Sequence, residues 1–169
     1  MMRRSILIVL AILLLASFAA AQRSEGEKNS LRGLSGIFVL VETVTEDARR
    51  QGLDNNLLQT DVELRLRKAS IHIASQTELI QSDKIGVLYI NVGTTQLKDG
   101  LFVVCENIDL RQSVRLARDN SIRLETATTY RINETFGTFP PSRLRDGVRS
   151  LINDKVDAFI SDYLAVNQR

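Results

Sequence analysis

The chain has 169 residues, which is enough for one ordinary domain and short for two. Apolar residues make up 44% of it and charged residues 25%, the composition of a globular protein. The 22 basic residues nearly balance the 20 acidic ones, so the total charge supplies no general attraction to nucleic acid or to an anionic membrane. Composition therefore predicts one globular domain and argues against nucleic acid as a partner.

Residues 1–21 have the pattern of a secretory signal peptide. Arg3 and Arg4 precede an apolar run over residues 6–16, and Ala19–Ala21 provides the small residues that signal peptidase requires. The alternative is an uncleaved anchor, but the apolar run is shorter than the roughly 20 residues of a spanning helix. We expect cleavage after Ala21, leaving 20 basic and 20 acidic residues. The expected product is soluble, periplasmic or extracellular, and without a stable membrane anchor.

After this segment, residues 22–30 are polar and aperiodic, which predicts a disordered leader. A single domain is expected over residues 31–169. Its first predicted strand, Ile37–Val44, is β-branched and continuously apolar through Val41, as in a strand covered on both faces.

A helix is predicted from a cap at Asp54 to about Lys68. Leu58, Val62 and Leu66 form an apolar stripe at helical spacing, and basic residues fill the last turn. The competing interpretation is an alternating strand over residues 62–67, but the cap and the terminal charges favour the helix.

Four further strands are expected. Ile71–Ile73 is short and alternating, and the three that follow are Val87–Val92, Leu101–Leu116 and Ile122–Ile132. The Asp99-Gly100 turn predicts a hairpin between the first two of these three. A two-residue turn there would put Val92 opposite Asn107, out of phase with the core. Either the loop has three residues or a bulge intervenes, and we favour a bulge at Gly93.

Alternation also predicts the register of the last hairpin. If Ile108, Leu110, Val114 and Leu116 all face the core, Val114 lies opposite Leu124 and Leu116 opposite Ile122. The loop is then Arg118–Asn120, with Asn120 a candidate for positive φ. The inward set of the final strand is Ile122, Leu124, Thr126, Thr128, Tyr130 and Ile132. On the outer face, this register sets Arg115 opposite Arg123 and Asp109 opposite Thr129.

Pro140-Pro141 ends the sheet region, and Ser142 is the predicted cap of a helix reaching about Leu164. Its apolar stripe is Leu144, Val148, Leu151, Ile152, Val156, Phe159, Ile160 and Tyr163. The predicted fold is thus α+β, a two-layer α/β sandwich. It has a mixed, largely antiparallel sheet of about five strands and two main helices on one face, in the order β-α-β-β-β-β-α.

Motifs that would indicate catalysis or cofactor binding are absent from the sequence. His72 is the single histidine and Cys105 the single cysteine, so a nucleophilic triad or a His-rich metal site has little to build on. No glycine-rich phosphate loop occurs, so no cofactor, catalytic residue or metal ligand is predicted. An exported chain with one cysteine has no intrachain disulfide, and Cys105 lies in an apolar run typical of a buried thiol.

Two charged groups are candidate interaction surfaces. The first is the outer face of the central strands, formed by Asp109, Arg111, Arg115, Arg123, Glu125 and Arg131. The second is Arg143, Arg145 and Arg149, whose charges oppose the dipole at the start of the last helix. An acidic partner would explain that second group, but Asp146 and nearby carboxylates explain it more simply.

Three stretches, 31–42, 57–71 and 157–167, resemble an uncharacterised family of exported bacterial α/β proteins without known activity. The element order is also loosely similar to small envelope-assembly domains such as the TolB N-terminal domain. These resemblances imply a fold and a compartment. We predict a non-catalytic binding or assembly protein of the bacterial cell envelope, with another envelope protein as partner. The alternatives are a carboxylate-dependent hydrolase using Glu42 or Asp61, and a carrier with an apolar cavity between sheet and helices.

Overall fold

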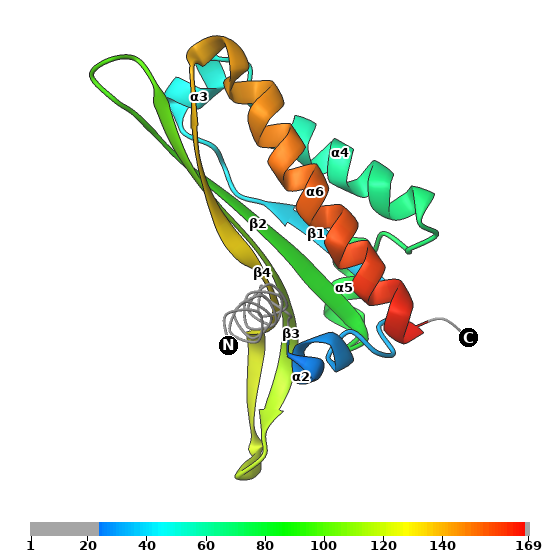
Figure 1. The fold of residues 1–169 in the computed structure, drawn as a ribbon. Helices are drawn as coiled ribbons and strands as arrows, with labels where there is room; N and C mark the ends of the chain where they lie inside the picture. The colour runs from blue at the N-terminus through cyan, green and yellow to red at the C-terminus, as the bar shows by residue number, and fades with distance from the viewer. Residues whose placement is uncertain (1–23, 168–169) are drawn as a thin grey trace, which may run out of the picture.

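The computed structural model describes residues 24–167, so the predicted signal segment and its cleavage site lie outside the described residues. Four strands form one sheet in the order β1-β2-β3-β4, and helices α4 and α6 lie side by side on one face of it (Figure 1). The strands are β1 (Gly36–Val41), β2 (Ile85–Gln96), β3 (Phe102–Leu116) and β4 (Asp119–Phe139). The helices are α2 (Glu25–Asn29), α3 (Glu46–Arg50), α4 (Asn55–Lys68), α5 (Gln76–Gln81) and α6 (Pro141–Asn167). The predicted α+β class is confirmed. Within residues 24–167, no helix is long and apolar enough to cross a membrane.

The sheet has four strands instead of about five because the predicted strand Ile71–Ile73 is reduced to one parallel bridge, between Ile73 and Ile37. The Ile37 N–H donates to the His72 carbonyl at 2.9 Å, and the Ala74 N–H donates to the Ile37 carbonyl at 2.9 Å. Immediately afterwards Ser75 caps α5 with a reciprocal capping box, which turns the chain out of the sheet. β1 therefore runs parallel to β2 as its direct neighbour.

The predicted disordered leader contains the short helix α2. Ser24 accepts a hydrogen bond from the Glu27 N–H while the Glu27 side chain reaches back to the Ser24 N–H, which forms a capping box. The Ser30 hydroxyl donates to the Thr129 carbonyl at 3.2 Å, so this segment is also tied to β4. Local capping and a long-range contact together explain why the polar composition was misleading here.

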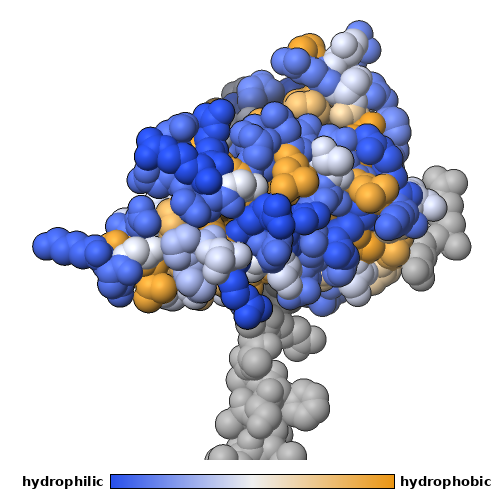
Figure 2. Space-filling model, turned by 90° about the horizontal axis from the view of Figure 1, so that it is seen from above, coloured by the Kyte–Doolittle hydropathy of each residue, from blue (hydrophilic) through white to orange (hydrophobic). Residues whose placement is uncertain are grey.

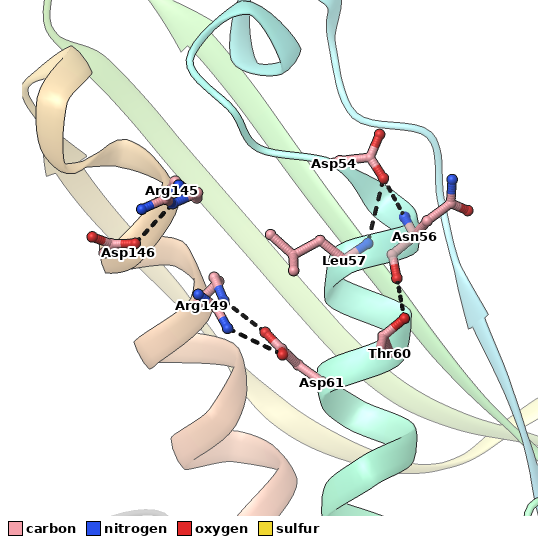
Figure 3. Close-up of polar contacts among 8 residues, drawn as sticks. All are labelled: Asp54, Asn56, Leu57, Thr60, Asp61, Arg145, Asp146 and Arg149. Carbon is pink, nitrogen blue, oxygen red and sulfur yellow. Dashed lines mark hydrogen bonds and ion pairs between the residues drawn. The ribbon is translucent and has the colours of Figure 1, made fainter.

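Helix α4 confirms the prediction for residues 54–68. The Asp54 carboxylate accepts hydrogen bonds from the Asn56 and Leu57 N–H groups (Figure 3). Leu58, Val62 and Leu66 are buried. The helix ends where Ser70 takes a positive φ of 60°, the only non-glycine residue in the described chain to do so. The position predicted for that conformation, Asn120, does not adopt it.

The β2–β3 hairpin has a three-residue loop, Lys98–Gly100, and no bulge at Gly93. The Leu97 N–H donates to the Leu101 carbonyl at 2.7 Å, and Gly100 has a φ of +86°. Val92 pairs with Glu106 and Gly93 with Cys105 in unbroken register. The bulge at Gly93 was wrong because an additional loop residue in the left-handed conformation corrects the phase within the turn.

The β3–β4 register is correct near the turn and wrong further along. Val114 pairs with Leu124 and Arg115 with Arg123 as predicted, but Asp109 pairs with Arg131 and Leu116 with Asp119. The loop is Ala117-Arg118 rather than Arg118–Asn120. Register shifts occur at four places along the pair, and each bulge places more residues in one strand than in its partner. A single alternation pattern cannot show how many bulges a hairpin contains.

The core lies between the sheet and the two long helices. α6 begins at Pro141, a residue suited to the first helical turn, one position before the predicted cap. Its buried apolar side chains are Leu144, Val148, Ile152, Val156, Phe159 and Tyr163, whereas Leu151 and Ile160 of the predicted stripe are half-buried. Phe159 contacts the Tyr130 ring edge-on, with centroids 5.7 Å apart at 73°. The apolar stripe of α6 thus determines which part of β4 is buried beneath that helix.

One glycine of α6 is required by close packing. An added Cβ at Gly147 would overlap the Phe139 ring at the end of β4. We expect Gly147→Ala to lower the free energy of unfolding by about 1 kcal/mol, because the overpacking cost of about 1–3 kcal/mol exceeds the helical preference for Ala. In a Phe139→Ala background the same change should stabilise the protein by about 1 kcal/mol, since only the helical preference remains. Urea unfolding of the four proteins checks the change of sign, and equal effects in both backgrounds would contradict the packing explanation.

Candidate binding surface

A polar network covers the outer face of the sheet, which is the face opposite α4 and α6. The Tyr89 hydroxyl donates to Glu42 Oε1 at 2.7 Å, and the Arg111 guanidinium lies 3.4 Å above the Tyr89 ring centroid. Arg111 Nε pairs with Asp109 Oδ1 at 2.9 Å, and Asn107 Nδ2 donates to Asp109 Oδ2 at 3.1 Å. Glu42 directly follows β1, Tyr89 belongs to β2, and Asp109 and Arg111 belong to β3. These side chains meet because alternate residues of neighbouring strands point to the same face of the sheet. A cation held over a ring and paired with a carboxylate has little rotational freedom, so this surface is preorganised.

Asp109 differs from the other residues predicted for this surface. It faces outward as expected, but only 2% of its surface is exposed. Arg111 and Asn107 both bind its carboxylate, and Arg131 lies opposite it in the register. Asp109 therefore orients Arg111 and is itself barely accessible to a partner.

The other predicted surface residues lie on or beside a projecting hairpin. We use "the arm" for residues 112–128, the part of the β3–β4 hairpin that extends past the end of β2 and beyond the two long helices (Figure 1). Arg123 Nη2 pairs with Asp83 Oδ1 at 2.7 Å and with Glu125 Oε2 at 3.1 Å. Arg115 Nη1 donates to the Asn120 carbonyl at 2.9 Å near the tip.

The arm also exposes apolar side chains that were predicted to face the core. Ile122 and Leu124 are 40% and 45% exposed, and Thr126 and Thr128 are exposed as well. From this inward set, only Tyr130 and Ile132 are buried. Leu124 pairs with Val114 as predicted, and the helices do not reach far enough to cover it. Thr128 instead pairs with Arg111 of the outer face, because the register shifts between Leu110 and Arg111.

A groove separates the arm from α5. Its volume is about 340 Å³, and it opens where β2 and β3 diverge beyond the pair Val87–Arg111. Leu79, Ile80, Ile85 and Val87 form its apolar side, while Arg111, Ser113 and Arg123 belong to the polar side. Ile80 at the rim is 78% exposed. The groove continues the outer face, because Arg111 belongs to both.

Two of the three arginines in the basic group at the start of α6, Arg145 and Arg149, are paired within the chain. Arg149 binds Asp61 of α4 through two nitrogens, at 2.6 and 3.1 Å, and Arg145 pairs with the neighbouring Asp146 at 2.9 Å (Figure 3). The hydrogen bonds and the negative charge of Asp61 raise the pKa of Arg149, so Asp61 already stabilises the charge of this arginine without an outside partner. The simpler explanation of this group therefore agrees with the contacts of Arg145 and Arg149.

Residues with possible chemistry lie apart from one another. His72 pairs with Glu78 at 2.7 Å on the surface, where the Ser75 backbone N–H and His72 lower the pKa of Glu78 to about 2. Cys105 is a half-buried free thiol in β3. Glu42 binds Tyr89 on the outer face, whereas Asp61 lies in a shallow cleft between α4 and α6. Glu42 and Asp61, the alternative carboxylates for a hydrolase, thus lie on different parts of the fold. In residues 24–167, no group of three or more His, Cys, Asp or Glu is arranged to hold a metal ion.

A buried ion pair was missed from the sequence. Glu106 is completely buried on the inner face of β3, and its Oε1 lies 2.9 Å from Lys155 Nζ of α6. Lys155 also donates to the Asn133 carbonyl of β4. Burial raises the pKa of Glu106, although Lys155 opposes that shift. Extending the inward alternation of Leu110 and Ile108 by two residues would have identified Glu106, and Lys155 lies beside Val156 in the apolar stripe.

The surface seen in Figure 2 is largely hydrophilic, with hydrophobic side chains in small, separate patches. No protein-family model matches the chain, and no curated protein matches its sequence. The resemblances drawn from its sequence accordingly stay predictions.

Proposed function

We propose that this chain is a non-catalytic binding or assembly protein exported to the bacterial cell envelope, and that it binds another envelope protein through the outer face of the sheet and the arm. The observation that carries the proposal is the arm. This hairpin exposes the apolar side chains of Ile122 and Leu124, an arrangement with little benefit to the folding of the domain. A partner that covered it would bury those side chains.

The outer face supports the same proposal. Its Arg111 is positioned by Tyr89 and Asp109, and preorganised side chains lose less conformational entropy when a partner binds. Export is supported by the signal-like pattern of residues 1–21.

Charge reversal on the proposed surface tests the proposal. We expect Arg115→Glu with Arg131→Glu to reduce recovery of a crosslinked partner from the envelope fraction by about tenfold or more, because like charges across an interface are strongly unfavourable. The matched control is Lys98→Glu with Arg143→Glu, which changes the net charge equally at exposed positions away from the arm. Quantitative mass spectrometry compares both variants with the wild type. Equal recovery of every crosslinked protein by both variants would overturn the proposal.

A further inference from the structure

One edge of the arm is a strand edge without a neighbour. β2 pairs with β3 as far as Val87 opposite Arg111, and β4 pairs with the other side of β3 down to Leu116. Within the described chain, no strand pairs with residues 112–116 on the β2 side. Alternate residues of a strand direct their N–H and C=O groups to alternate sides, so this edge presents free backbone donors and acceptors.

The groove lies along this edge. Ile85 and Val87 mark the start of β2, and Ser113 belongs to the free edge of β3, so the groove lies between the start of β2 and the part of β3 that β2 leaves unpaired. Its volume of about 340 Å³ suits one or two side chains rather than a folded domain. A strand at this edge would direct every second side chain toward Leu79 and Ile80 of α5.

Charge indicates the kind of strand that fits. Residues 111–131 contain five arginines and only two carboxylates, Asp119 and Glu125. Arg123 lies at the groove and is paired with Asp83, whose side chain is 69% exposed. An exposed ion pair of this kind is weak and can exchange one carboxylate for another.

We propose that the arm captures an extended, acidic segment of its partner by strand addition to β3 at residues 112–116, with one or two apolar side chains of that segment in the groove. The inference rests on the proposed binding function and specifies its mode. Backbone hydrogen bonds would supply affinity, the groove would select apolar residues at alternate positions, and Arg123 would bind a carboxylate.

Selection from a random heptapeptide library displayed on phage is the first test. The probe is the library itself, with the purified domain as bait. We expect selected peptides to be enriched in Asp or Glu and to carry Val, Ile or Leu at alternate positions. Selection of basic or helical-period sequences, or failure to enrich any, would overturn the inference.

Variants and modified peptides then locate the site. We expect Arg123→Glu to weaken binding of the best peptide by about tenfold or more, whereas Arg143→Glu, at an exposed position of α6 away from the groove, should change it by less than about threefold. Asp83→Asn should strengthen binding about threefold by releasing Arg123, a gain that misfolding cannot mimic.

N-methylation of alternate peptide amides should weaken binding, and hydrogen exchange should slow at residues 112–116. No effect of N-methylation at any position would exclude strand addition.

These results are separable from those of the proposed function. If partner recovery depends on Arg115 and Arg131 but no acidic extended peptide binds, strand addition is wrong and the binding function stands. If the peptide makes the protein dimerise instead of occupying the groove, as sedimentation would show, the edge serves a second copy of the chain and the inference also fails.

Discussion

Replacing Lys155 with Met is expected to lower the free energy of unfolding by about 3–5 kcal/mol at pH 7, because it leaves the carboxylate of Glu106 buried without its counter-ion. Glu106 is completely buried, and Lys155 is only 9% exposed. Met retains most of the length of the lysine side chain, so the change chiefly removes the charge. Urea unfolding measured at pH 7 would show the loss directly.

The pH dependence of this variant follows from the pKa of Glu106. Burial already raises that pKa, and removing the Lys155 ammonium should raise it further. A carboxyl group whose pKa is higher in the folded chain than in the unfolded chain contributes stability below the unfolded pKa of about 4.3, and this contribution is lost as the pH rises through the folded pKa. The difference between wild type and Lys155→Met should therefore be largest at neutral pH and shrink as Glu106 becomes protonated.

The double variant Glu106→Leu with Lys155→Met separates the cost of an unpaired charge from the value of the pair. Removing both charges should restore stability to the wild-type level or exceed it by about 1–4 kcal/mol, as apolar replacements of buried ion pairs often do. A double variant as unstable as Lys155→Met would contradict the explanation. In that case the contact between Lys155 and the Asn133 carbonyl, and not the charge of Glu106, would dominate.

The second large effect is expected at Phe159. Its side chain is fully buried, packs edge-on against Tyr130, and lies 6.0 Å from the Tyr163 ring between centroids. Phe159→Ala should lower the free energy of unfolding by about 3–5 kcal/mol through lost burial and the cavity left behind. The matched control is Phe136→Ala on β4, where 69% of the side chain is exposed, and there the change should stay within about 0.5 kcal/mol. Similar losses at both positions would contradict the assignment of the core.

Phe159 also bears on the arm. Tyr130 is the last buried aromatic residue of β4 before the exposed part of the hairpin, and its hydroxyl donates to Asp162 of α6 at 2.9 Å. The arm is thus rooted in the α6 contact. Hydrogen exchange in Phe159→Ala should accelerate first at residues 128–132, and the proposed binding by the arm should weaken with it.

Local chemistry determined much of this fold in advance. The Asp54 carboxylate and the stripe of Leu58, Val62 and Leu66 specify α4, because capping and helical periodicity act within a few residues. The apolar stripe of α6 and the pairing of Val114 with Leu124 were predictable for the same reason. The candidate surface was recognisable as charged residues alternating with apolar ones.

Only the tertiary structure decided how far along each strand the apolar and charged faces are buried or exposed. Whether Ile122 and Leu124 are buried depends on how far α4 and α6 extend over the sheet, and alternation carries no information about that distance. The stacking of Arg111 on Tyr89, the pairing of Glu106 with Lys155 and the groove beside α5 each join segments that lie on different elements. Two register shifts in the β3–β4 ladder, between Leu110 and Arg111 and between Gln112 and Val114, moved the partner of Asp109 from Thr129 to Arg131. The sequence by itself determined which faces are apolar and which are charged. The three-dimensional packing decided which of those faces a partner can reach.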